Sequence, residues 1–173
     1  MLKWLGIIVG VIVVLVAAVF IAGSMMPQNH TASRTAQLSQ PPESVWTVIT
    51  NIDSFPSWRN DVAVAEQLPS RDGKVVWRET SRSRNALTYE AETAEPPRHL
   101  VTRITDKGLP FGGSWDYMIV PDGSGSRITI TEHGEIYNPI FRVVSRAMGH
   151  TSTIDAYLKS LAGRLGDSYT PPG

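Results

Sequence analysis

The sequence contains no cysteine, which excludes disulfides, thiolate metal sites and cysteine nucleophiles. It also has no excess of charge of either sign, with 16 Lys and Arg against 16 Asp and Glu. Nucleic-acid-binding proteins normally show a basic excess or a basic stripe, so we expect no nucleic acid partner. The G-x-S-x-G motif of a nucleophile elbow is missing too. The 173 residues are enough for one domain with a sizeable core.

What the chain does have is a long apolar run at its N-terminus. Residues 4–23 read WLGIIVGVIVVLVAAVFIAG, without one charged side chain. At about 1.5 Å per residue, this run is long enough to cross a hydrocarbon core of about 30 Å. We therefore expect residues 1–23 to be a transmembrane anchor or an uncleaved signal. A cleaved signal peptide is the alternative, with AGS at 22–24 as its cleavage site.

The orientation of this segment follows from its flanking charges. Lys3 precedes the run, and no basic residue follows it until Arg34. Basic residues tend to stay on the cytoplasmic side of a membrane. The pattern predicts a single-pass membrane protein with a cytoplasmic N-terminus and an extracytoplasmic domain.

The remaining chain divides into a polar linker at 24–33, a globular unit at 34–166 and a loose tail at 167–173. A first strand is expected within 33–40, and a helix after Pro41 and Pro42, because proline suits the first turn of a helix. Several strand-like segments follow. SRDG at 70–73 and PDGSG at 121–125 are typical of tight turns between antiparallel strands.

The C-terminal region, 138–165, has helical periodicity. Asn138 is a good N-cap, Pro139 a good first residue, and Gly149 is expected to bend or loosen the helix. An antiparallel sheet with one buried face needs a cover, and this helix is the element long enough to supply it. The sequence thus predicts an α+β domain, with a curved antiparallel β-sheet wrapped around a long C-terminal helix and a cavity between them.

Three segments carry a resemblance to a known superfamily: PPESVWTVITNIDSFPSW at 41–58, EPPRHLVTRI at 95–104 and TEHGEIYNPIFRVV at 131–144. In these the chain resembles the SRPBCC, or START-like, superfamily, which includes polyketide cyclase/dehydrase-like proteins. The resemblance implies a helix-grip fold around a hydrophobic cavity. It also implies binding of lipids, sterols, polyketides, quinones or hormones and, in some members, cyclisation or dehydration.

The segment ITITEHGEIYNPIF, 128–141, places Glu132, His133 and Glu135 close together. Side chains alternate along a strand, so Glu132 shares the face of Ile128 and Ile130, which is the buried one. His133 and Glu135 then point outward, unless a bulge intervenes at Gly134. This excludes a three-residue site on a regular strand. An inward Glu132 is a structural ion-pair partner, a polar anchor for a ligand, or a general acid.

Metal and cofactor sites are not predicted. His30, His99 and His150 lie in unrelated segments without the spacing of metal ligands. We expect neither a metal nor a cofactor.

Aromatic side chains form a second group of candidates. They occupy alternating positions on predicted strands or, for Phe111, the flexible loop GLPFGG at 108–113. Such residues either fill the core or line a pocket for a bulky apolar ligand, whose orientation hydroxyl and indole donors would fix. The predicted ligand-binding residues are Trp77, Tyr89, Phe111, Trp115, Tyr117 and Glu132.

Together these patterns predict a membrane-anchored binding or carrier protein for a small hydrophobic ligand, such as a lipid, a quinone or a polyketide-like molecule. One alternative is an enzyme of the cyclase/dehydrase type, with Glu132 and Tyr89 or Tyr117 as acid–base groups. Another is a cell-envelope interaction module whose aromatic side chains fill the cavity.

Overall fold

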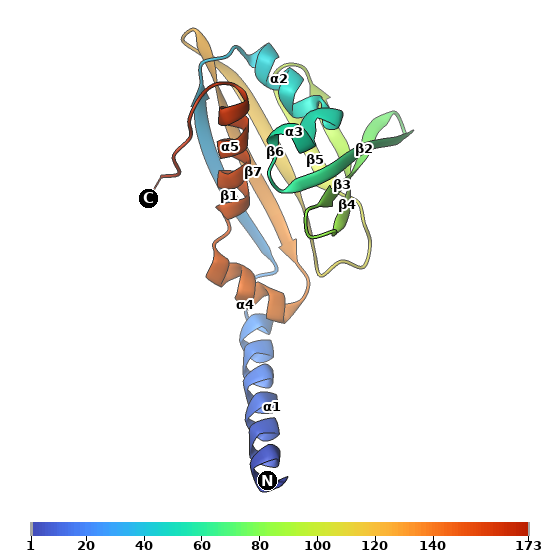
Figure 1. Cartoon of the computed structure of the whole chain (residues 1–173), viewed down its shortest axis with the longest axis vertical. Helices are drawn as coiled ribbons and strands as arrows, with labels where there is room; N and C mark the ends of the chain where they lie inside the picture. Colours follow the sequence, from blue (N-terminus) through green and yellow to red (C-terminus); the bar gives the residue numbers. More distant parts are fainter. Residues whose placement is uncertain (1, 173) are drawn as a thin grey trace.

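The computed structural model describes residues 2–172 and shows one helix projecting from a single folded domain (Figure 1). This helix, α1 (Leu2–Ser24), makes the N-terminal segment. Within Lys3–Ser24, an 18-residue stretch has a mean hydropathy of 3.2, and no residue of that stretch is buried inside the protein. By length and composition, α1 is the one helix among the described residues that is able to cross a membrane.

The domain is built on a seven-stranded antiparallel sheet with the strand order β1-β7-β6-β5-β4-β3-β2. The strands are β1 (Asn29–Leu38), β2 (Val62–Arg71), β3 (Lys74–Ser81), β4 (Ala86–Glu95), β5 (His99–Ile104), β6 (Phe111–Asp122) and β7 (Gly125–Ile136). All neighbours from β2 to β7 are consecutive in the sequence, and β1 closes the order beside β7. The sheet curves around one helix, which confirms the predicted helix-grip fold (Figure 1).

The expected turns lie where the sequence places them. Arg71 pairs with Lys74, so Asp72 and Gly73 form a two-residue turn, both with positive φ. This geometry matches the right-handed twist of the flanking strands. The hairpin between β6 and β7 turns in the same short way after Asp122.

The segment 24–33, expected to be a linker, is divided between two elements. Helix α1 continues to Ser24, and β1 already begins at Asn29, so four residues connect them. Strand β1 is an edge strand with few inward apolar side chains, the small Ala32 and Ala36 among them. An edge strand with polar outward residues gives little hydrophobic signal, which explains why its first half resembles a loop in sequence.

The C-terminal region is two helices rather than one long helix. Helix α4 (Pro139–Met148) starts as predicted, because the Asn138 side chain accepts hydrogen bonds from the backbone N–H groups of Ile140 and Phe141. It ends at Gly149, whose φ of +82° breaks the helix. Among the described side chains of these two helices, only those of α5 (Ser152–Arg164) contribute to the hydrophobic core.

The core lies between α5, the short helices and the inner face of the sheet. Helix α2 (Pro42–Thr50), the 3-10 helix η1 (Ile52–Ser54) and α3 (Phe55–Trp58) cover one end of that face. The side chains of α5 that enter the core are Ile154, Leu158, Leu161 and Ala162, all almost completely buried. They meet Ile119, Ile128 and Ile130 of the central strands, and the core holds α5 at a distance from β3 and β4 that leaves a cavity.

Candidate functional site

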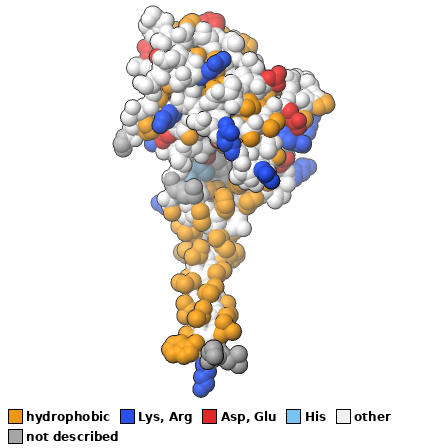
Figure 2. All heavy atoms as spheres, in the orientation of Figure 1, with side chains coloured by type: hydrophobic (Ala, Val, Ile, Leu, Met, Phe, Trp, Pro, Cys, Tyr) orange, Lys and Arg blue, Asp and Glu red, His pale blue; other side chains and the backbone are white. Residues whose placement is uncertain are grey.

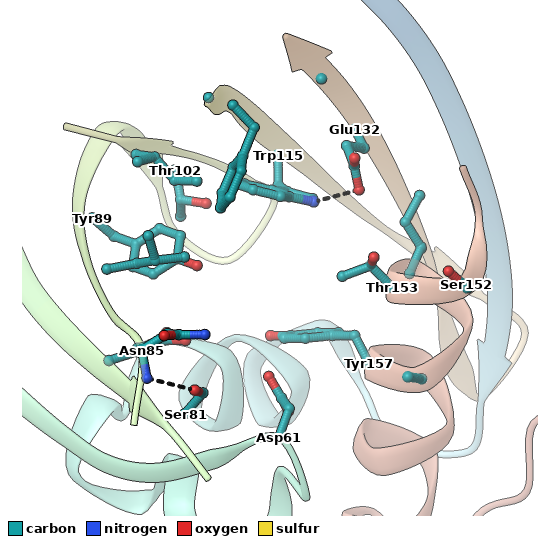
Figure 3. Close-up of a pocket in the computed structure, with 18 of the residues that line it drawn as sticks. Asp61, Ser81, Asn85, Tyr89, Thr102, Trp115, Glu132, Ser152, Thr153 and Tyr157 are labelled. Carbon is teal, nitrogen blue, oxygen red and sulfur yellow. Dashed lines mark hydrogen bonds between the residues drawn. The ribbon is translucent and has the colours of Figure 1, made fainter. Parts of the chain in front are cut away.

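A cavity of about 1150 Å³ lies between α5 and the inner face of the sheet (Figure 3). This volume is slightly larger than the usual range for small-molecule sites, roughly 300–1,000 Å³. Strands β3 to β7 contribute one wall, and α3 and α5 contribute the other. Exposed lining residues gather on the β3–β4, β5–β6 and α4–α5 connections, where the cavity opens.

Aromatic rings line most of the inner wall. The rings of Trp77 and Tyr89 stack with centroids 5.5 Å apart and an interplanar angle of 16°. Trp115 lies 6.1 Å beyond Tyr89, and Tyr117 faces Tyr157 of α5 at 5.6 Å. This continuous aromatic surface offers flat apolar contacts suited to a planar or extended ligand.

The tyrosine hydroxyls supply polar points on this apolar wall. Burial raises the pKa of Tyr117 to about 12 and raises the pKa of Tyr89 and Tyr157 above the ordinary value. These phenols therefore remain protonated at neutral pH and act as hydrogen-bond donors, not as bases. Within residues 2–172, the hydroxyls of Tyr89 and Tyr157 have no hydrogen-bond partner in the protein.

One polar group, the Arg59 cluster (Arg59, Asp61, Trp77 and Glu79), lies where α3 meets β2 and β3. Arg59 donates from one Nη to Glu79 at 2.9 Å and from the other to Asp61 at 2.7 Å. The Trp77 indole donates to the same Glu79 oxygen at 2.9 Å. Burial opposes the charge on Arg59, but the negative charges of Glu79 and Asp61 outweigh burial and raise its pKa.

A second polar group, the His30 cluster (His30, Trp115, Glu132 and His150), lies near the opening. Glu132 accepts hydrogen bonds from the Trp115 indole at 3.0 Å and contacts His30 Nε2 at 3.2 Å. The His30 ring stacks on His150 with centroids 4.0 Å apart. Burial lowers the pKa of His150, and electrostatic repulsion between the two imidazoles of His30 and His150 lowers it further.

Gly134 makes room for this cluster. It lies opposite His30 in the β1–β7 register, and a Cβ at Gly134 would stand 2.1 Å from His30 Cε1. Any side chain at this position would displace the imidazole from the inner face of the sheet. The glycine therefore allows His30 to reach Glu132.

The strand parity predicted for 128–136 is confirmed. The register of β7 runs without a shift past Gly134 on both sides, so no bulge intervenes. Glu132 faces the cavity, while His133 is exposed and Glu135 bonds to Tyr137 and Arg103 on the outer side. Within residues 2–172, no group of three His, Asp or Glu side chains is arranged to hold a metal ion.

The structure brings all six predicted ligand-binding residues to the cavity wall: Trp77, Tyr89, Phe111, Trp115, Tyr117 and Glu132. That they bind a ligand stays a prediction. As acid–base candidates, the tyrosines are limited by their raised pKa values, and both carboxylate oxygens of Glu132 already contact protein groups.

Among the lining residues that the sequence did not predict, His30, Arg59, His150 and Tyr157 carry polar groups or rings into the cavity wall. His30 lies in the segment expected to be a linker, and His150 follows the glycine that breaks the C-terminal helix. Arg59 comes directly after a short turn, where an arginine is ordinarily solvated. Tyr157 offered a usable signal, because it shares the apolar stripe of α5 that faces the sheet.

Comparison with known proteins agrees with this architecture. The sequence profile of the family described as "Polyketide cyclase / dehydrase and lipid transport" matches residues 29–166. The match begins with β1, in agreement with the structural start of the domain. No curated protein matches the chain.

Among solved structures, the chain is similar to a START superfamily protein from Mycobacterium smegmatis, with a TM-score of 0.62 and 13% identity over 79% of this chain and 97% of that one. It is also similar to the Zhui aromatase/cyclase from Streptomyces sp. R1128, with a TM-score of 0.64 and 13% identity over 80% and 94% of the two chains. A norcoclaurine synthase point mutant from Thalictrum flavum gives a TM-score of 0.63 and 11% identity over 79% and 94%. At these identities the likeness shows a shared fold.

Proposed function

The chain belongs to the polyketide cyclase / dehydrase and lipid transport family, and from this we propose that it is a membrane-anchored protein that binds a small apolar ligand in the cavity. The observation that carries the proposal is the aromatic wall of Trp77, Tyr89 and Trp115, which surrounds a space large enough for a lipid or a multi-ring molecule. A pocket of this kind would exchange water for apolar contact over most of the ligand's surface.

The polar side chains of the cavity indicate which functional groups the ligand would carry. Protonated phenols donate hydrogen bonds, so the hydroxyls of Tyr89 and Tyr157 favour a ligand with carbonyl or hydroxyl oxygens along its length. The carboxylates of both clusters are already paired with Arg59, His30 or an indole. A quinone, a polyketide or a lipid with an oxygenated end fits this chemistry better than a pure hydrocarbon does.

Anchoring is the second part of the proposal. We propose that α1 spans the bilayer once, with Lys3 on the cytoplasmic side and the domain outside. A membrane-impermeant maleimide tests the orientation, because the chain has no cysteine of its own. In intact cells, a Val120→Cys variant is expected to be labelled. Labelling only after cell lysis would place the domain in the cytoplasm.

Ligand binding is tested on the full chain extracted from membranes. Native mass spectrometry should show a co-purifying apolar molecule, and the fluorescent probe N-phenyl-1-naphthylamine should bind saturably and displace it. Trp115→Ala is expected to weaken probe binding about tenfold, because one aromatic contact beyond area burial contributes about 0.5–1.5 kcal/mol and about 1.4 kcal/mol is a factor of ten. Glu132→Gln should change ligand selectivity more than stability.

The matched control is Trp46→Ala, which removes the same kind of side chain from α2, outside the cavity lining. Its probe affinity should equal that of the wild type. A wild-type protein with no co-purifying molecule and no saturable probe binding would overturn the proposal.

A cyclase or dehydrase activity is the second candidate, and one observation favours it. His30 lines the cavity and its ring nitrogen lies 3.2 Å from Glu132, an arrangement in which a carboxylate orients an imidazole base. The activity predicts turnover of an oxygenated multi-ring or polyketide substrate that His30→Gln abolishes while probe binding persists. Equal turnover in wild type and His30→Gln would remove this candidate.

A further inference from the structure

Helix α4 carries an apolar face that the described residues leave about 40% exposed. Ile140 is 39% exposed and Val144 is 45% exposed, and with Phe141 they lie on one side of the helix at spacings of three and four residues. Tyr137 just before the helix is half exposed as well. Amphipathic helices with such a face lie in the interface of a bilayer or pack on a partner.

The position of α4 relative to α1 is fixed by direct contacts. Arg142 donates to the carbonyl oxygens of Gly23 and Met26, each at 3.3 Å, and to Ile136 O at 2.8 Å. Gly23 itself is buried against Pro139, and a Cβ there would come within 1.9 Å of Pro139 O. The end of α1 and the start of α4 are thus one packed unit rather than two parts joined by a flexible tether.

The length of α1 determines how close to the bilayer α4 would lie. The 23 residues of α1 span about 35 Å at about 1.5 Å per residue, close to the hydrocarbon core of about 30 Å. A helix that crosses the bilayer has almost no length left to lift the domain away from it. Figure 1 shows α4 lying across the end of α1, at the level where the chain leaves the apolar segment.

The opening of the cavity lies on the same side. Phe141 of α4 stacks on Phe111 at the start of β6, with ring centroids 5.9 Å apart, and both rings line the cavity. Gly149 and His150, which follow α4, belong to the lining as well. In Figure 2, histidine atoms are visible in a recess directly above the apolar helix.

The charges around this opening suit a phospholipid surface. Arg84, Lys107 and Arg146 are exposed, and none of them forms an ion pair within residues 2–172. Arg84 lines the cavity, Lys107 lies on the β5–β6 connection that also lines it, and Arg146 lies on α4. Basic side chains at the rim and apolar side chains between them match the phosphate layer and the acyl chains beneath it.

We propose that the exposed face of α4 and the Phe111–Phe141 rim are embedded in the headgroup layer of the bilayer that α1 spans, so that the cavity opens onto the membrane. The ligand then passes between the acyl-chain region and the aromatic wall without crossing water. This inference rests on the proposed anchoring by α1 and adds a route of access to the proposed ligand binding.

The absence of cysteine allows a direct test by single spin labels on the full chain in phosphatidylcholine nanodiscs. Val144→Cys places the label on α4. Val120→Cys is the matched control, because Val120 is also an exposed valine, at 37%, but lies near the β6–β7 turn at the opposite end of the domain. Power saturation should give a several-fold higher ratio of oxygen to nickel-chelate accessibility at 144 than at 120.

Three outcomes would overturn the inference. Equal ratios at the two positions would place α4 in water. Strong dipolar broadening between labels at 144 in different molecules would instead show that a second copy of the chain covers this face. An unchanged rate of N-phenyl-1-naphthylamine loading from vesicles in Ile140→Asn/Val144→Asn, compared with Val120→Asn, would show that the face plays no part in ligand access.

The result is separable from the outcome for the proposed function. Native mass spectrometry of the same nanodisc samples reports on the ligand independently of label depth. A label embedded in the bilayer, with no bound molecule in the cavity, would support membrane insertion of α4 and contradict the proposed ligand binding. A label exposed to water, with a bound molecule in the cavity, would support ligand binding and contradict membrane insertion of α4.

Discussion

Replacing Arg59 tests whether the polar cluster at the α3 side of the cavity stabilises the fold. The side chains of Arg59 and Glu79 are 12% and 9% exposed and are joined by a 2.9 Å hydrogen bond. Arg59→Met keeps the length of the side chain and its contact with the Phe55 and Tyr157 rings, which lie 5.3 Å from the guanidinium carbon. The substitution leaves the Glu79 carboxylate buried with the Trp77 indole as its remaining partner in the cluster.

The expected loss is about 3–5 kcal/mol, the range for removing one partner of a buried ion pair. Most of this cost comes from the uncompensated charge that remains, not from the lost attraction. Arg59→Met/Glu79→Gln should therefore be more stable than Arg59→Met alone, because the amide carries no charge and still accepts from the indole. A double-mutant cycle between the two positions should show a large coupling energy.

Urea unfolding of the full chain in detergent micelles, followed by tryptophan fluorescence, measures these differences. The control is Arg78→Met, whose contact with Glu66 at 3.8 Å joins two half-exposed side chains and should contribute less than about 1 kcal/mol. A loss for Arg59→Met as small as that of the control, or a double variant no more stable than the single, would refute the reasoning.

Three other substitutions or titrations have defined outcomes. Gly134→Ala should destabilise the protein by about 1–3 kcal/mol, because the new Cβ would overlap His30. The control is Gly163→Ala on α5, whose Cβ meets no atom within 4 Å and which should be neutral or stabilising. Urea unfolding midpoints of the two variants measure the difference. The pKa of Tyr117 is about 12 in the fold, above its ordinary value of about 10, so the folded state keeps a proton that the unfolded state loses. Stability should fall between pH 10 and pH 12 by up to about 1.4 kcal/mol per unit, and less in Tyr117→Phe. The pKa of His150 is lowered in the folded state, so its contribution to folding stability is present above about pH 6.5 and is lost as the pH falls. A proton NMR titration of His150 with a midpoint at or above about pH 6.5 would contradict this effect of burial.

The sequence predicted the parts of the fold that rest on uninterrupted periodicity. The period-two pattern of Ile128, Ile130 and Glu132 runs through a strand with no register shift, so the inward direction of Glu132 could be worked out in advance. The same holds for the aromatic side chains of β3, β4 and β6, whose strand positions bring them to one face.

The position of His30 in the cavity and the exposure of α4 could not be predicted, because they depend on contacts between segments that are distant in the sequence. His30 meets Glu132 across 102 residues, from an edge strand with little periodicity. The apolar stripe of α4 has the same spacing as a core-facing stripe, yet the helix ends at Gly149 and none of its described side chains belongs to the core. Periodicity shows that a helix has an apolar face, but it does not show whether the core, a bilayer or another protein covers that face.

The position of β1 also has a consequence for how the protein folds. Strand β1 pairs only with β7 among the described strands, and its partner residues lie about a hundred positions later in the chain, as in the pair Ala32 and Glu132. Closing a loop of that length costs about 4 kcal/mol of chain entropy beyond a constant, and such long-range pairings form slowly. During synthesis β1 emerges directly after the apolar helix and has to wait until residues 125–136 are made. We therefore expect the β2–β6 meander to form first and the His30 side of the cavity to be completed last, in the final step of folding.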